Sequence, residues 1–222
     1  MSTIVEVKDL VKYYGKGDNL VKAVDHTDFK AERGTFTAVV GRSGSGKSTL
    51  LQLMGGLDRP DSGKVIIDGT SIYDLNGNDL AVFRRRKIGF IFQDYNLIPS
   101  LDVWENLVLP LGLDGRKANE EEIEKILEEI GLSDRRNAMP DTLSGGQKQR
   151  VAIGRALASN PSVILADEPT GNLDSRTELE VLAVLKRCVA DFNSTIVMIT
   201  HNEAIAQMAD VVTVIEDGKV VR

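Results

Sequence analysis

The sequence predicts an α/β fold with a mostly parallel core sheet, an antiparallel β region near the N-terminus and an inserted helical lobe. Three observations support this prediction. The first third of the chain is rich in strand-like runs, the middle is helical in pattern, and the last third alternates short apolar strands with helices. Strands that alternate with helices form βαβ units and a parallel sheet. We expect one domain over residues 1–222, with its α/β core at 1–93 and 161–222 and its helical lobe at 94–160.

The first third is expected to contain several strands and one helix. Its strand-like runs alternate or are uniformly apolar, and glycine and proline separate them. A helical pattern of leucines follows the glycine-rich segment after residue 40. The strands expected here are residues 4–7, 35–40, 63–68 and 88–92.

The middle of the chain has one clear amphipathic helix, at residues 119–130. Asn119 is expected to cap it, with Glu122 completing a capping box, and Gly131 is expected to end it. In the last third, uniformly apolar runs predict buried strands. The elements expected there are strands at 163–166, 195–200 and 211–216 and a helix at 178–190.

Composition limits the classes of function. The 222 residues carry a net charge of −6 and only 5% aromatic residues, which argues against nucleic acid as a partner. Cys188 is the sole cysteine, which excludes an intramolecular disulfide, and we expect it to be a buried apolar side chain. The apolar runs are far shorter than the roughly 20 residues that span a bilayer. If the protein works at a membrane, a partner must supply the spanning part.

Residues 41–48 read Gly-Arg-Ser-Gly-Ser-Gly-Lys-Ser and match the phosphate-loop pattern G-x-x-x-x-G-K-[ST]. Glycines let backbone N–H groups turn toward an anionic phosphate, and the helix that follows adds the positive end of its dipole. Lys47 can reach the β- and γ-phosphates, and Ser48 can bind Mg²⁺. The residues expected to contact ATP here are Gly41, Ser43, Gly44, Ser45, Gly46, Lys47, Ser48 and Thr49.

Two carboxylates, Asp167 and Glu168, follow the apolar run at 163–166. The ends of parallel strands are where α/β folds bind ligands. Asp167 is suited to hold Mg²⁺, and Glu168 is suited to polarise the attacking water. The pair alone could equally be helix-capping acids, but together with a phosphate loop it predicts a nucleoside triphosphatase.

Residues 143–147 read Leu-Ser-Gly-Gly-Gln. Ser144 and Gln147 have the spacing of a capping box at a helix N-terminus. Gly145 and Gly146 expose backbone donors at the positive end of that helix, which makes a second anion site possible. The residues alone leave both interpretations open: a capped helix, or an anion site.

The segment Leu-Ser-Gly-Gly-Gln resembles the signature motif of ABC-transporter ATPases, and further motifs follow in the order of that family. Tyr14 is similar to the aromatic residue that stacks on adenine, although adjacent Tyr13 is an alternative. Gln93 resembles the Q-loop glutamine, Asp174 belongs to a segment similar to the D-loop, and His201 resembles the switch histidine. The resemblance covers essentially the whole chain.

This resemblance implies a head-to-tail homodimer with ATP between the two chains. The partner subunit would contribute the signature residues Ser144, Gly145, Gly146 and Gln147 to the ATP site. It also implies Mg²⁺ bound by Ser48, Asp167 and Gln93, and catalysis by Glu168, Gln93 and His201. Asp174 would couple the two subunits. An integral membrane permease is the implied second partner, with the chain at the cytoplasmic face of the cell membrane.

Several stretches resemble one branch of the family, which includes macrolide-exporter, lipoprotein-release and antimicrobial-peptide-resistance systems; residues 94–97 and 198–203 resemble the bacitracin-resistance type most. We therefore expect a role in antimicrobial peptide or antibiotic export or resistance. Lipoprotein-release and cell-division ATPases are the alternatives, and a soluble ABC ATPase acting on DNA or ribosomes is a more remote one. The stretches are residues 55–60, 83–93 and 166–174.

Two features stay open at this level. The basic run at residues 84–87 is either a solvated face or a contact with the membrane partner or lipid headgroups. Trp104 lies either in the core of the helical lobe or in the groove that receives the membrane partner.

Overall fold

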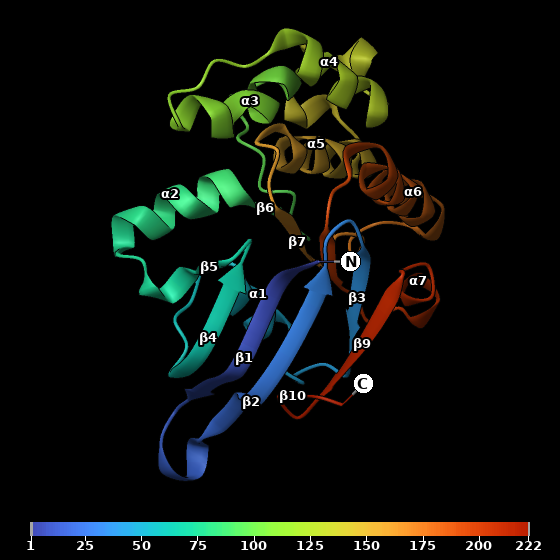
Figure 1. Ribbon diagram of the computed structural model, residues 1–222. Helices are drawn as coiled ribbons and strands as arrows, with labels where there is room; N and C mark the ends of the chain where they lie inside the picture. Colours follow the sequence, from blue (N-terminus) through green and yellow to red (C-terminus); the bar gives the residue numbers. More distant parts are fainter. Residues whose placement is uncertain (1, 222) are drawn as a thin grey trace.

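The computed structural model describes residues 2–221 and contains two β-sheets flanked by helices (Figure 1). The first sheet has four strands in the order β2-β1-β4-β5, and every pairing in it is antiparallel. It is the antiparallel N-terminal region that the sequence predicts, extended by a long strand, β2, that was not predicted. Its strands are β1 (Thr3–Tyr14), β2 (Val21–Glu32), β4 (Ser62–Ile67) and β5 (Thr70–Ser71).

The second sheet has six strands in the order β10-β9-β3-β8-β7-β6. All neighbours in it are parallel except β9 and β10. The predicted, mostly parallel core sheet is therefore confirmed. Parallel strands place their carboxyl ends at one edge, which is where ligands bind in such sheets. Its strands are β3 (Phe36–Val40), β6 (Ile88–Phe92), β7 (Val163–Asp167), β8 (Ile196–Ile199), β9 (Val211–Glu216) and β10 (Lys219–Val220).

Helices α3, α4 and α5 gather at one end of the molecule, above the core sheet in Figure 1. They belong to the stretch between β6 and β7. None of the helices within residues 2–221 is both long and apolar enough to cross a bilayer. The helices are α1 (Lys47–Met54), α2 (Gly77–Lys87), α3 (Val103–Leu113), α4 (Glu120–Glu129), α5 (Gly145–Ala158), α6 (Ser175–Phe192) and α7 (Glu203–Ala206), with 3₁₀ turns at Gly17–Asn19, Ile72–Asp74, Ser133–Arg135 and Pro140–Thr142.

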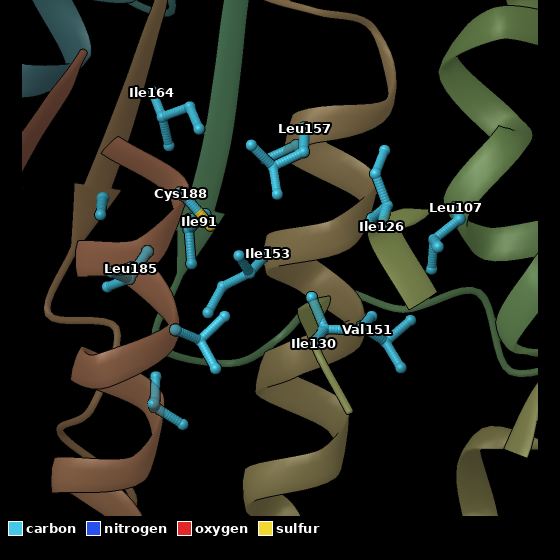
Figure 2. Close-up of a cluster of buried hydrophobic side chains, with 14 of the residues drawn as sticks. Ile91, Leu107, Ile126, Ile130, Val151, Ile153, Leu157, Ile164, Leu185 and Cys188 are labelled. Carbon is cyan, nitrogen blue, oxygen red and sulfur yellow. The ribbon is translucent and has the colours of Figure 1, made fainter. Parts of the chain in front are cut away.

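Two apolar clusters hold these layers together. One packs the leucines of α1, such as Leu50 and Leu53, against both sheets. The other packs α5 against β7, α6 and the lobe helices, and Figure 2 shows Ile153 and Leu157 of α5 near Cys188. Cys188 is buried as predicted, and burial raises the pKa of its thiol to about 12. Because α1 lies between the sheets, the loop that precedes it has a fixed position.

Of the two predicted capping boxes, the structure confirms one and contradicts the other. Ser144 and Gln147 form the predicted capping box at the start of α5. The box predicted for Asn119 and Glu122 is wrong: α4 starts where expected, but the Asn119 side chain accepts the N–H of Glu121 instead. In a capping box the cap side chain accepts the N–H of the third helical residue, here Glu122. Asn119 accepts the N–H of the second helical residue instead, so the reciprocal pair of bonds does not form.

The members of the basic run at 84–87 are partly exposed, and each also has a partner within the chain. Arg84 donates to the carbonyl of Gly56 at 2.7 Å. Arg85 and Arg86 both bind the Asp114 carboxylate, at 2.6 and 2.8 Å. These pairs connect α2 to the segment after α1 and to the end of α3, and no local sequence pattern predicts partners so distant along the chain.

Asp68 joins three separate parts of the core. Its carboxylate accepts from Arg33 at 2.6 Å, from Lys87 at 3.0 Å and from Ser162 at 2.9 Å. These bonds, that from Lys87 first, lower the pKa of Asp68 from 3.8 to about 2. A carboxyl whose pKa falls on folding stabilises the folded state above its unfolded pKa, and this contribution is lost as the pH falls.

Asp68→Asn is therefore expected to lower the free energy of unfolding at pH 7 by about 1–2 kcal/mol. The difference from wild type should shrink as the pH falls from about 4 toward 2, where Asp68 becomes protonated. Urea unfolding at pH 7 and at pH 3 measures both. Asp134→Asn is the control, since that side chain is 82% exposed and its loss should change little. A difference that stayed constant with pH would contradict this role of Asp68.

Candidate nucleotide site

The phosphate loop connects β3 to α1 at the carboxyl edge of the core sheet. Gly46 caps α1 with a left-handed backbone (φ 100°), and a Cβ at this position would overlap the carbonyl of Ala23. Glycine is therefore required there. No side chain caps α1, so the first N–H groups of that helix are available to an anion.

Lys47 folds back across its own loop. Its ammonium donates to the carbonyls of Gly41 at 2.8 Å and Arg42 at 2.9 Å, and the residue is only 7% exposed. A buried ammonium needs close partners. Phosphate oxygens would be stronger partners than carbonyls because they are charged. The ammonium is thus held at the mouth of the loop, as phosphate binding requires.

Asp167 is the last residue of β7, and Glu168 follows it directly, beside this loop. The Ser48 hydroxyl donates to Asp167 Oδ1 at 3.1 Å. Burial raises the pKa of Asp167, and the Glu168 carboxylate adds to the rise, while Ser48 and Lys47 oppose it. Glu168 adopts a left-handed backbone (φ 45°), and its Oε2 lies 3.3 Å from Nδ1 of His201. Such backbone strain is common at functional sites.

A cavity of ≈ 550 Å³ brings most of the predicted residues together. Tyr14 contributes to its wall, whereas Tyr13 does not and instead binds the Asp25 carboxylate through its hydroxyl. This placement favours Tyr14 over Tyr13 as the residue that faces a nucleotide base. The lining residues are Tyr14, Val21, Ala23, Ser43, Gly44, Ser45, Gly46, Lys47, Ser48, Thr49, Glu168 and His201.

A second hollow of ≈ 370 Å³ adjoins the first, and both are lined by Ser48 and Glu168. Gln93 lines this second hollow together with Asp167. Its side-chain amide donates to Asn172 Oδ1 at 2.8 Å, and the Asn172 amide donates in turn to Asp94 Oδ1 at 3.1 Å. The predicted Q-loop and D-loop segments are therefore bonded to each other. Asn172 belongs to the segment that resembles the D-loop, but no role was predicted for its side chain.

Asp174 and the signature residues lie outside both cavities. Asp174 caps α6, accepting the N–H groups of Arg176 and Thr177 at 3.1 Å. Gly146 packs so closely on Thr177 that a Cβ would overlap it. None of the residues 144–147 lines either hollow. One chain therefore places Tyr14, the phosphate loop, the carboxylates, Gln93 and His201 together, but not its own signature.

The geometry at Ser48 and Asp167 fits a magnesium ion bound together with a nucleotide. A hydroxyl and a carboxylate oxygen 3.1 Å apart are the hard oxygen ligands that Mg²⁺ prefers. Among the side chains that the structure describes, no cluster of three or more histidine, cysteine, aspartate or glutamate residues could hold a metal unaided. Phosphate oxygens and water would have to complete the coordination, as is usual for Mg²⁺ at phosphate sites.

Comparison with known proteins identifies the family. The model of the family described as "ABC transporter" matches residues 24–171. An uncharacterized ABC transporter ATP-binding protein of Mycobacterium tuberculosis is 44% identical over 220 residues, which cover 98% of this chain and 89% of that protein. The chain therefore belongs to the ABC transporter family, as an ATPase cassette, and the predicted family and fold are confirmed.

Two further relatives bear on the kind of cassette. The macrolide export ATP-binding/permease protein MacB of Hyphomonas neptunium is 44% identical over 98% of this chain, but the chain spans only 34% of that protein. The dimeric cassette MJ0796 of Methanocaldococcus jannaschii, solved in a post-hydrolysis state with ADP and phosphate, is 41% identical, with a TM-score of 0.86 over 99% of this chain and 97% of that one. The chain thus corresponds to a whole cassette and to about a third of MacB.

Proposed function

We propose that two copies of this chain bind Mg-ATP between them and hydrolyse it to power a membrane permease. One observation carries the proposal. The phosphate loop, the carboxylates and His201 line shared cavities, whereas the signature residues 144–147 of the same chain lie elsewhere. The phosphate loop of one copy and the signature residues of a second copy would both contact the nucleotide if the two chains pair head to tail. The solved dimer of the similar cassette MJ0796 supports this arrangement.

Each residue then has a role. In the core (1–93 and 161–222), the phosphate loop and Lys47 hold the phosphates, and Tyr14 stacks on adenine. Ser48, Asp167 and Gln93 would hold Mg²⁺, which would supply positive charge to balance that of the phosphates. Glu168 accepts a proton from the attacking water, and His201, 3.3 Å from it, orients that carboxylate and the γ-phosphate.

The signature belongs to the helical lobe (94–160) and acts on the partner's nucleotide. The Ser144 hydroxyl, the backbone N–H groups of Gly145 and Gly146 and the dipole of α5 would bind the γ-phosphate, with Gln147 keeping Ser144 in place through the capping box. Asp174 caps the start of α6 and lies two residues after Asn172, which is bonded to Gln93. From this position Asp174 would couple the two subunits. Loss of the γ-phosphate removes this contact and opens the dimer.

A groove of ≈ 430 Å³ between α2 and the end of α3 fits a helix of the permease. Phe90, Pro110 and Leu113 supply apolar surface, and Leu113 is 65% exposed. Arg84, Arg85 and Arg155 add positive charge at the edge. Trp104 does not line this groove and stacks against Arg136 instead, 3.7 Å from the ring centroid.

The chain would thereby be held at the cytoplasmic face of the membrane. Its similarity to macrolide export proteins supports antibiotic or antimicrobial peptide export or resistance as the process served. Lipoprotein release and cell division are the alternatives within the branch.

Leu113→Arg is expected to abolish retention of the permease, because an arginine there buries unpaired charge in the groove. Co-expression with the membrane protein encoded next to the chain, followed by capture in detergent, measures this. Val211→Arg is the control: Val211 is also exposed and apolar, but lies on β9 away from the groove. Equal retention of permease by both variants would argue against this docking site, and ATP hydrolysis by each variant should be unchanged.

A further inference from the structure

Two neighbouring tyrosines end β1 in matching surroundings. The Tyr13 hydroxyl binds the Asp25 carboxylate, and the ammonium of Lys22 lies 5.4 Å from the centroid of its ring. The Tyr14 hydroxyl donates to Asp58 Oδ2 at 2.6 Å, and the ammonium of Lys12 lies 5.1 Å from its ring centroid. The environments thus have the same chemistry, but only Tyr14 lines the nucleotide cavity.

The carboxylate of Asp58 is itself held firmly. Its Oδ1 accepts from the backbone N–H of Arg59 at 2.6 Å and from the Lys12 ammonium at 3.1 Å. Lys12 also donates to the carbonyl of Arg59 at 2.7 Å. Bonds to charged groups are the stronger class of hydrogen bond. Lys12 and Asp58 thus connect β1 to the segment after α1, and their shared bonds fix where the Tyr14 hydroxyl points.

We propose that Asp58, supported by Lys12, is a positioning residue that presets the Tyr14 ring for stacking on the base of ATP. This proposal rests on the proposed function, in which Tyr14 is the adenine platform. The Lys12 ammonium lies over the Tyr14 ring, and Tyr14 is 40% exposed and lines the cavity, so the base would stack on the other face of the ring. A ring fixed before binding loses less rotational freedom when the ligand arrives.

The position of Asp58 also predicts which part of the nucleotide it affects. Asp58 lines neither hollow of the nucleotide site and reaches the ligand only through Tyr14. Its loss should weaken recognition of the base and leave phosphate binding unchanged. Inorganic tripolyphosphate has the phosphates of ATP without its base, and therefore separates the two effects.

The test measures the affinity of the full chain for Mg-ATP and for magnesium tripolyphosphate by calorimetry. Tyr14→Phe keeps the ring and removes the bond, and Asp58→Ala removes the acceptor. Each is expected to bind ATP roughly three- to tenfold more weakly, with tripolyphosphate affinity unchanged. The double variant should be no weaker than the single ones, because both lose the same bond. Tyr13→Phe is the matched control and should change neither affinity.

Unchanged ATP affinity in Tyr14→Phe, which has the smallest effect on folding, would overturn the proposal. Equal losses for ATP and tripolyphosphate would also overturn it, because they would mean that Asp58 supports the phosphate loop and not the base. A wild-type chain that binds tripolyphosphate as well as ATP would show that Tyr14 is no adenine platform. A wild-type chain that binds neither would refute the proposed nucleotide site itself.

Discussion

The Glu168→Gln chain is expected to bind Mg-ATP and form a lasting dimer while losing ATP turnover. Glutamine keeps the size of glutamate but cannot take the proton from water, and loss of a general base lowers rates by roughly 10²- to 10⁴-fold. Its neighbour His201, 3.3 Å away, is not expected to substitute, because its proposed role is to orient the Glu168 carboxylate and the γ-phosphate. Phosphate release measures the turnover, and gel filtration with ATP measures the dimer.

Two controls make this result specific. Glu121→Gln, on the exposed face of α4, should hydrolyse ATP like the wild type. The Glu168→Gln chain without ATP should elute as a monomer, because a ligand that binds only the dimer stabilises only the dimer. A Glu168→Gln chain that stayed monomeric with saturating ATP would count against ATP as the link between chains.

Lys47→Ala is expected to weaken ATP binding by roughly 10- to 100-fold, which corresponds to losing a hydrogen bond to a charged group. Lys47 is 7% exposed, and its ammonium is held by the carbonyls of Gly41 and Arg42. Arg42, the other cation of the loop, does not line the cavity and is not expected to replace it. Equilibrium binding of ATP and of tripolyphosphate measures the loss, which should be similar for both because Lys47 would contact only the phosphate part of the nucleotide.

Lys64→Ala, on the exposed part of β4, is the matched control and should bind ATP normally. The melting temperature of Lys47→Ala should not fall, since removing a buried ammonium also removes its desolvation cost. Unchanged nucleotide affinity in a folded Lys47→Ala chain would show that the loop is not a phosphate site.

Local patterns were sufficient to predict the parts of the fold that depend on short-range chemistry. Strand β3, the glycine loop and α1 follow from one contiguous pattern, and β7 ends at Asp167, directly before Glu168. Helix α2 was not predicted because none of its residues is fully buried and it contacts the core only through partly buried side chains such as Leu80 and Phe83, which are too few to form an apolar stripe. Strand β2, by contrast, alternates buried and exposed residues along much of its length, and that pattern was present in the sequence.

The contacts that organise the site were beyond sequence reasoning for a different reason. Tyr14 and Asp58 are 44 positions apart, and Gln93 and Asn172 are 79 apart. No periodicity links residues at such separations, because the fold alone brings them together. The same holds for the arginines that bind Asp114. The residue types of the site could thus be predicted, but the partners that orient them could not.

A mixture of two inactive variants tests most directly whether ATP is hydrolysed between two chains. Lys47→Ala damages the phosphate loop and keeps the signature, whereas Ser144→Arg damages the signature and keeps the phosphate loop. A head-to-tail pair of the two has one site built from the intact halves. Mixing them in equal amounts is therefore expected to restore phosphate release, up to half that of the wild type, while each alone stays inactive. If both variants are folded and their mixture stays as inactive as its components, hydrolysis at a site shared between chains is contradicted.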